Sequence, residues 1–142
     1  MPIAKLLTDD VAVCAFVPPE MLAALAPRFR TIINNRPDAE EPGQPSSAEI
    51  EAEARRLGLD YIHIPVVAER IGDAEVAAFG KALTGRKGPV LAFCKSGRRA
   101  ATLWALSQAG KGNVEEILAA AAAAGYDLSA LAPKLAQQAA SK

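Results

Sequence analysis

One of the two cysteines in the chain lies where an apolar run gives way to a basic turn. Cys94 ends the run PVLAFC (89–94), and KSGRR (95–99) separates it from a helical pattern. A thiolate at the start of a helix is stabilised by unpaired backbone N–H groups, by the helix dipole and by nearby cations, all of which lower its pKa. The stretch therefore predicts a nucleophilic cysteine in an anion-binding loop. The alternative is a buried structural cysteine followed by a turn that happens to be basic.

The residues of this loop have different expected roles. Cys94 is the expected nucleophile, and Arg99 is expected to hold the anion at the end of the loop. Gly97 permits a positive φ or a close backbone approach, which a loop folded around an anion needs. The remaining substrate-binding candidates of the loop are Lys95, Ser96 and Arg98. We expect the Ser96 hydroxyl to reach the thiolate and Arg98 to point elsewhere on the turn.

Other polar residues are candidates with a structural alternative beside the functional one. Arg36 and Asp38 follow an apolar run, and we interpret them as an arginine that binds the substrate anion and an aspartate that orients it. The sequence Arg-Pro-Asp is also typical of turns. The alternative interpretation is therefore a structural loop that a salt bridge anchors. His63, the only histidine, lies within a predicted strand. We expect it to be a hydrogen-bonded structural residue rather than a catalytic base. Cys14 could resolve a persulfide or disulfide on Cys94, although its position within a predicted strand argues against this.

The elements that must position these residues alternate along the chain. Apolar runs predict strands, and periodic segments with capping signals predict helices between and after them. The expected strands are 11–16, 29–35, 61–66 and 89–94, and the expected helices begin near residues 46, 73, 101, 113 and 128. Alternating strands and helices predict an α/β fold with a mainly parallel sheet flanked by helices. In such sheets ligands bind at the carboxyl ends of the strands, where Cys94 and Arg36 would meet.

Composition and charge exclude several classes of function. The 142 residues are 51% hydrophobic, which suits one domain over 1–142, and the sixteen basic residues balance the sixteen acidic ones. Neither nucleic acid nor a membrane is therefore expected as a partner. Without an apolar leader or spanning segment we expect a cytoplasmic protein, and the spacing of Cys14 and Cys94 fits no zinc site, so we expect no metal and no cofactor.

These motifs resemble a known family. FCKSGRRA resembles the active-site loop of cysteine-dependent rhodaneses and tyrosine phosphatases. With N-x-R-P-D-x-E at 34–40, H-I-P at 63–65 and G-P-V-L-A-x-C-x-S-G-x-R at 88–99, the region from about 8 to 110 resembles the phosphatase-like domain of β-lactamase-hydrolase-like proteins of bacteria. The resemblance implies a cysteine-phosphatase (dual-specificity phosphatase) fold, with the helices of 113–140 outside its strongest part. Some members are fused to a persulfide dioxygenase, so the resemblance also implies such an enzyme as a partner.

The loop departs from the tyrosine phosphatases in length. Their pattern is C-x5-R, whereas Arg99 gives C-x4-R, the rhodanese length. Monoester hydrolysis also needs a general acid, and the nearest candidate after the strand at 61–66 is Glu69, because Asp73 fits a helix cap better. We therefore expect a rhodanese-type sulfurtransferase that passes sulfur from a small anionic donor through a Cys94 persulfide. A tyrosine or dual-specificity phosphatase acting on a phosphate ester is the alternative, and a non-catalytic anion-binding module is the third.

Overall fold

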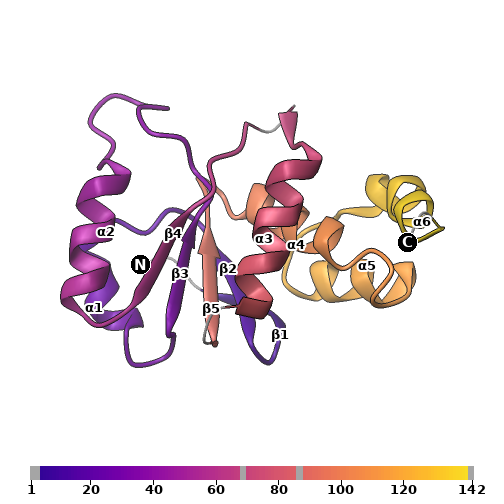
Figure 1. Ribbon diagram of the computed structural model, residues 1–142, viewed down its shortest axis with the longest axis horizontal. Coiled ribbons are helices and arrows are strands. Elements are labelled where there is room, and N and C mark those ends of the chain that lie inside the picture. Colours follow the sequence, from indigo (N-terminus) through magenta and orange to yellow (C-terminus); the bar gives the residue numbers. More distant parts are fainter. Residues whose placement is uncertain (1–3, 68–69, 86–87, 141–142) are drawn as a thin grey trace.

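The computed structural model describes residues 4–67, 70–85 and 88–140, and a five-stranded sheet lies at its centre (Figure 1). The strands are β1 (Lys5–Thr8), β2 (Val11–Cys14), β3 (Thr31–Asn34), β4 (Asp60–His63) and β5 (Val90–Phe93). The helices are α1 (Leu22–Leu25), α2 (Ser47–Arg56), α3 (Asp73–Gly85), α4 (Arg98–Ser107), α5 (Val114–Ala123) and α6 (Ala132–Ala140). The α/β fold expected from the sequence is confirmed.

The sheet has the order β1-β2-β5-β3-β4, which puts β5 at its centre. β5 pairs in parallel with β2 and with β3, and β3 pairs in parallel with β4. Only β1 runs antiparallel, in its pairing with β2. All four parallel strands therefore end at one edge of the sheet, and the segment after β5 leaves from the middle of that edge.

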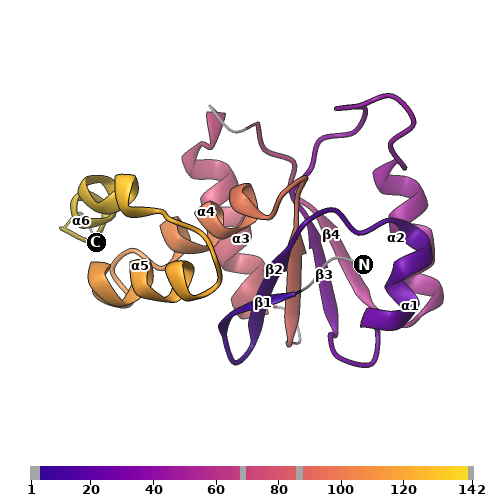
Figure 2. The same ribbon diagram turned by 180° about the vertical axis from the view of Figure 1, so that it is seen from behind.

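Helices cover both faces of the sheet (Figures 1 and 2). α1 and α2 lie on one face, and α3 and α4 lie on the other, with α5 and α6 beyond α4. Alternate side chains of each strand enter two hydrophobic clusters, because successive residues of a strand point to opposite faces. In β5, Ala92 belongs to the cluster under α3 and α4, and Phe93 belongs to the cluster under α1 and α2.

The local signals account for most element boundaries. The side chains of Ser46 and Asn113 accept hydrogen bonds from the N–H groups of Glu49 and Glu116, as the capping-box spacing predicts. α4 begins at Arg98, three residues before the expected start, because Gly97 serves as its N-terminal cap. β1 was not expected from the sequence, since only one residue of KLLT, Leu7, is buried. No helix in the described part of the chain is long and apolar enough to cross a membrane.

Candidate active site at the Cys94 loop

Cys94 lies directly after the central strand, with its side chain fully buried. The backbone N–H of Gly97 donates a hydrogen bond to its Sγ at 3.1 Å. The thiol therefore lies between the end of β5 and the first turn of α4, where the dipole of a ten-residue helix favours a negative charge. The Cys94 sulfur thus accepts a backbone hydrogen bond at the point where the sequence places the anion-binding loop.

Gly97 is the one position in the loop where no side chain fits. Its φ is +94°, in the left-handed region. A Cβ on Gly97 would lie 2.1 Å from the Tyr126 hydroxyl and 3.1 Å from the Cys14 carbonyl oxygen. The Tyr126 hydroxyl in turn donates to the Ser96 carbonyl oxygen at 3.2 Å. Burial raises the pKa of Tyr126, and the negative charge of Cys94 adds to this, so the phenol stays protonated and acts as a donor.

Arg99 is held in a fixed orientation by a carboxylate and a carbonyl. Its Nη1 donates to Glu40 Oε2 at 2.7 Å and to the Val66 carbonyl oxygen at 2.8 Å, and its Nη2 donates to Glu40 Oε1 at 2.9 Å. These bonds use three of the five N–H groups of the guanidinium. The Nε–H and the second Nη2–H, which lie side by side on one edge, remain to grip an oxyanion. The hydrogen bonds to Glu40 and the nearby Cys94 raise the pKa of Arg99.

Arg36 shares the Glu40 carboxylate with Arg99. Its Nε donates to Glu40 Oε1 at 2.9 Å, and its guanidinium stacks on the Phe16 ring with 4.8 Å from Cζ to the centroid. The side chain is only 5% exposed. Hydrogen bonds from Arg99 and then from Arg36 hold the pKa of Glu40 below its usual range, so this residue is an anion at neutral pH.

Lys95 forms an ion pair with the next acidic residue, Glu41. The same Glu41 carboxylate lies 3.6 Å from Arg36 Nη2. Both Lys95 and Glu41 are about half exposed or more, at 61% and 49% of their side chains. The hydrogen bond from Lys95 lowers the pKa of Glu41. Two successive carboxylates of one loop thus pair with three cations, Arg99, Arg36 and Lys95.

Three of the predicted site residues make contacts that lead away from the thiol. The Asp38 carboxylate accepts from the Ser47 N–H at 2.7 Å and so anchors the start of α2. The Ser96 hydroxyl accepts from the Arg98 N–H at 3.3 Å rather than contacting Sγ. The Arg98 Nη2 donates to the Asp127 carbonyl oxygen at 3.0 Å, which agrees with the expectation that this arginine points elsewhere on the turn.

Cys14 and His63 support the surrounding structure. Cys14 pairs with Phe93 in the β2–β5 register, and its side chain enters the cluster under α1 and α2, whereas that of Cys94 enters the opposite cluster. Burial, with a smaller contribution from Cys94, raises the pKa of Cys14 to about 12. The two thiols therefore face opposite sides of the sheet, which disfavours a disulfide. His63 Nε2 is hydrogen-bonded to the Arg36 carbonyl oxygen at 2.8 Å.

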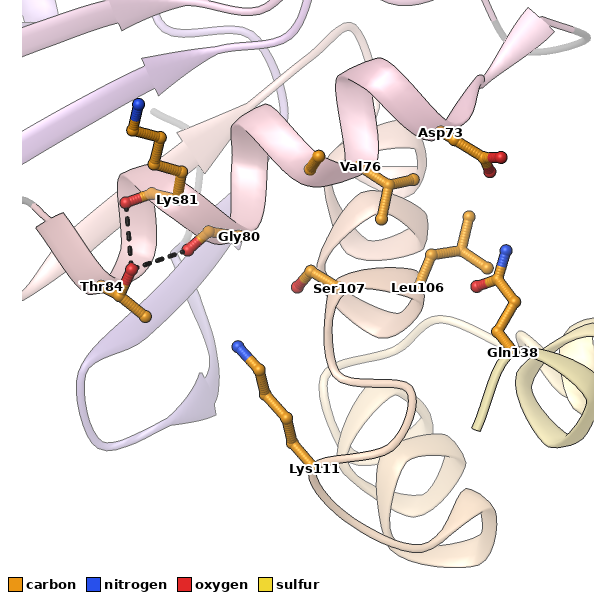
Figure 3. Close-up of a pocket in the computed structure, with 10 residues that line it drawn as sticks. Asp73, Val76, Gly80, Lys81, Thr84, Leu106, Ser107, Lys111 and Gln138 are labelled. Carbon is orange, nitrogen blue, oxygen red and sulfur yellow. Dashed lines mark hydrogen bonds between the residues drawn. The ribbon is translucent and has the colours of Figure 1, made fainter. Parts of the chain in front are cut away.

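The general-acid candidates do not meet Cys94 in the described structure. Glu69 lies outside the described residues. Asp73 is the first residue of α3 and lines a cavity of about 530 Å³ between α3 and α4 (Figure 3). Lys111 and Gln138 also line this cavity, and no residue of the 94–99 loop does. Within the described ranges, no group of His, Cys, Asp and Glu side chains is arranged to hold a metal ion.

Sequence reasoning did not single out three residues that the structure places at the loop. Glu40 and Glu41 belong to the acidic segment after Arg36, and Tyr126 follows α5. Glu40 closes the motif N-x-R-P-D-x-E, so its place in that motif was the available signal. Nothing local marks Tyr126, because its contact with Ser96 spans 30 residues of sequence.

The fold and the cysteine loop place the chain among proteins with a cysteine-phosphatase-like architecture. A candidate phosphatase from Neisseria meningitidis Z2491 superimposes with a TM-score of 0.83 and 31% identity, over 94% of this chain and 96% of that one. Tk-PTP in its active form superimposes with a TM-score of 0.77 over 98% of this chain and 97% of that one, and its 17% identity shows the fold alone.

The chain belongs to the family described as "Beta-lactamase hydrolase-like protein, phosphatase-like domain", which matches residues 4–111. A beta-lactamase hydrolase-like protein from Xylella fastidiosa (strain Temecula1) is 45% identical over 102 residues, which is 70% of this chain. The match covers only 24% of that relative, so the chain corresponds to about a quarter of its length. The family resemblance found in the sequence is confirmed. These likenesses favour the phosphatase interpretation over the sulfurtransferase that we placed first, to which they lend no support.

Proposed function

We propose that this chain is a cysteine-dependent phosphatase of the tyrosine or dual-specificity type, with Cys94 as its nucleophile and a phosphate monoester as its substrate. The observation that carries the proposal is the held Arg99, whose free edge can grip two oxygens of an anion beside the Cys94 thiol. Membership of a phosphatase-like family supports it.

The reaction follows from the residues around the thiol. The Cys94 thiolate attacks phosphorus, the bond from phosphorus to the ester oxygen breaks, and a phosphocysteine forms. Arg99 and the start of α4 stabilise the charge on the transferring group. Water then attacks the phosphocysteine, which releases phosphate and restores the thiolate.

Proton donation to the leaving oxygen is the weak point of this site. Glu40 and Glu41 have lowered pKa values and are anions at neutral pH, so neither is a suitable donor. General acid catalysis is typically worth about 10² to 10⁴ in rate. We therefore expect good turnover only where the leaving oxygen is a weak base that needs no proton.

A comparison of p-nitrophenyl phosphate with phenyl phosphate tests the proposal. The former should be hydrolysed faster by about 10² or more, because its leaving group departs without a proton. Cys94→Ser should abolish the hydrolysis, and Cys14→Ser, on the opposite face of the sheet, should spare it. Absence of hydrolysis of both esters by the folded protein would refute the proposal.

Sulfur transfer remains the second candidate because one observation favours it, the C-x4-R spacing of Cys94 and Arg99. A thiolate that attacks thiosulfate needs no general acid. Intact mass after incubation with thiosulfate separates the two: gain of one sulfur atom on Cys94 but not in Cys94→Ser, together with no ester hydrolysis, would favour the sulfurtransferase. A persulfide dioxygenase as the partner belongs to this second candidate.

A further inference from the structure

Arg99, Arg36 and Lys95 form a continuous chain of ion pairs with one acidic loop. Arg99 and Arg36 share the Glu40 carboxylate, and Arg36 and Lys95 share the Glu41 carboxylate. Lys95 and Arg99, at the two ends of this chain of ion pairs, both belong to the loop that follows Cys94. Only Arg99 is needed to grip a single phosphoryl group, which leaves Arg36 and Lys95 without a role in the proposed reaction.

The two carboxylates are held very differently. Glu40 accepts two hydrogen bonds from Arg99 and a third from Arg36, and its side chain is 25% exposed. Glu41 is 49% exposed, pairs with the exposed Lys95 and reaches Arg36 only at 3.6 Å. Exposed ion pairs of this kind contribute little, because water competes for both partners. An incoming anion can therefore displace Glu41, whereas Glu40 stays with the two arginines.

Arg36 has a donor that the resting structure does not satisfy. Its side chain is 5% exposed, and its Nη2 is buried with no hydrogen-bond partner among the described residues. A carboxylate oxygen of Glu41 lies 3.6 Å from Nη2, which is beyond hydrogen-bond distance. A buried cationic donor without a partner is costly, so an anion that reached Nη2 would bind favourably.

We propose that Arg36 and Lys95 form a second anion subsite beside Cys94, which the Glu41 carboxylate occupies until substrate binds. The inference rests on the proposed function and narrows its substrate class to phosphate monoesters that carry a second phosphate group close to the first. One group lies at Cys94 and Arg99, and the other replaces Glu41 at Arg36 and Lys95. The acidic loop thus favours esters with a second phosphate group over esters with one, because only the second group competes with Glu41.

Binding of two phosphonates to the wild-type chain tests this inference without turnover. Methylphosphonate has one anionic group and methylenediphosphonate has two, and titration calorimetry measures both. We expect methylenediphosphonate to bind tighter by about tenfold or more, as a second charge-assisted contact allows. Glu41→Gln should raise the affinity for methylenediphosphonate by up to about fivefold, which corresponds to the free energy of an exposed ion pair. The affinity for methylphosphonate should rise by much less. Lys95→Gln should remove most of the advantage in affinity that methylenediphosphonate has over methylphosphonate.

The variants are chosen so that a loss of folding is not mistaken for a loss of binding. Glu41 and Lys95 are surface residues, whereas loss of the buried Arg36 would disturb the fold. Glu115→Gln, an exposed carboxylate in the first turn of α5, is the matched control and should change neither affinity. Equal tightening of both probes by Glu41→Gln, or no tightening, would overturn the subsite. Hydrolysis of aryl phosphates is measured separately, so its loss would refute the proposed function while a selective gain in binding still supported the subsite.

Discussion

Replacement of Gly97 by alanine tests whether the loop geometry depends on the contact with Tyr126. The substitution forces a side chain into a left-handed conformation, at φ +94°, and places its Cβ 2.1 Å from the Tyr126 hydroxyl. Tyr126 must therefore move and give up its hydrogen bond to the Ser96 carbonyl oxygen. The Cys14 carbonyl oxygen, at 3.1 Å, belongs to the backbone after β2 and yields less easily.

The expected cost follows from these contacts. The left-handed conformation costs about 1–2 kcal/mol for a residue with a Cβ, and loss of the hydrogen bond costs about 1 kcal/mol. Alanine recovers about 0.5–1 kcal/mol through the lower entropy of the unfolded chain. With the displaced Tyr126 packing added, we expect the free energy of unfolding to fall by about 2–3 kcal/mol, which lowers Tm by roughly 5–10 °C.

Urea denaturation of a double-mutant cycle separates the clash from the backbone effect. Gly58→Ala is the control for φ, because Gly58 has φ +79° and a Cβ there would meet nothing within 4 Å. In the Tyr126→Ala background, Gly97→Ala should cost about 1 kcal/mol less than in the wild type, since residues in contact couple by about 0.5–3 kcal/mol. Two results would refute the reasoning. One is that the stability losses of Gly97→Ala and Tyr126→Ala are additive; the other is that Gly97→Ala and Gly58→Ala lose the same free energy of unfolding.

Other predictions follow from the same contacts. Arg99→Lys should lower kcat/KM for p-nitrophenyl phosphate by about 10² or more, because a lysine cannot provide the two-donor edge, and Arg98→Lys by only a few-fold; the reverse order would show that Arg98 holds the anion. Burial raises the pKa of Cys14 from 9.0 to about 12, so the native state holds its proton more tightly. The free energy of unfolding should therefore fall as pH rises from 9 to 12. In urea titrations, Cys14→Ala should reduce the slope of this fall by up to about 1.4 kcal/mol per pH unit. An unchanged slope would contradict the burial of the thiol. The pKa of Glu40 is lowered, so the stability difference between wild type and Glu40→Gln should be present above the ordinary carboxyl pKa of 4.5 and disappear as pH falls below it; a difference that persists in acid would point to packing instead.

The sequence was sufficient to predict the four parallel strands and the place of Cys94 at the end of β5. Apolar runs bounded by turn residues mark β2 to β5, and parallel strands bring the residues after β3 and β5 to one edge. Arg36 and Cys94 therefore lie at the same edge of the sheet, as the order of strands and helices predicts. β1 was missed because it carries only one buried side chain, which leaves no alternating pattern to detect.

The contacts of the site were less accessible to sequence reasoning. Glu40 and Arg99 are 59 residues apart, and which carboxylate of the acidic loop reaches the arginine depends on how that loop folds back. Ala39, just before Glu40, has a φ of +60°, a conformation that the residue type does not suggest. Asp38 was interpreted as a residue that orients substrate, but its carboxylate accepts from the Ser47 N–H nine residues later, a contact that depends on how the loop folds back.

The contact of Tyr126 with the Cys94 loop has a consequence for the length of chain that forms this loop. The family match ends at residue 111, whereas Tyr126 and Asp127, which contact Ser96 and Arg98, lie beyond it. A chain shortened to the matched region would keep the sheet and α4 but lose the hydroxyl that covers Gly97. The segment that follows α5 therefore belongs to the same structural unit as the loop, although the two are about 30 residues apart in the sequence.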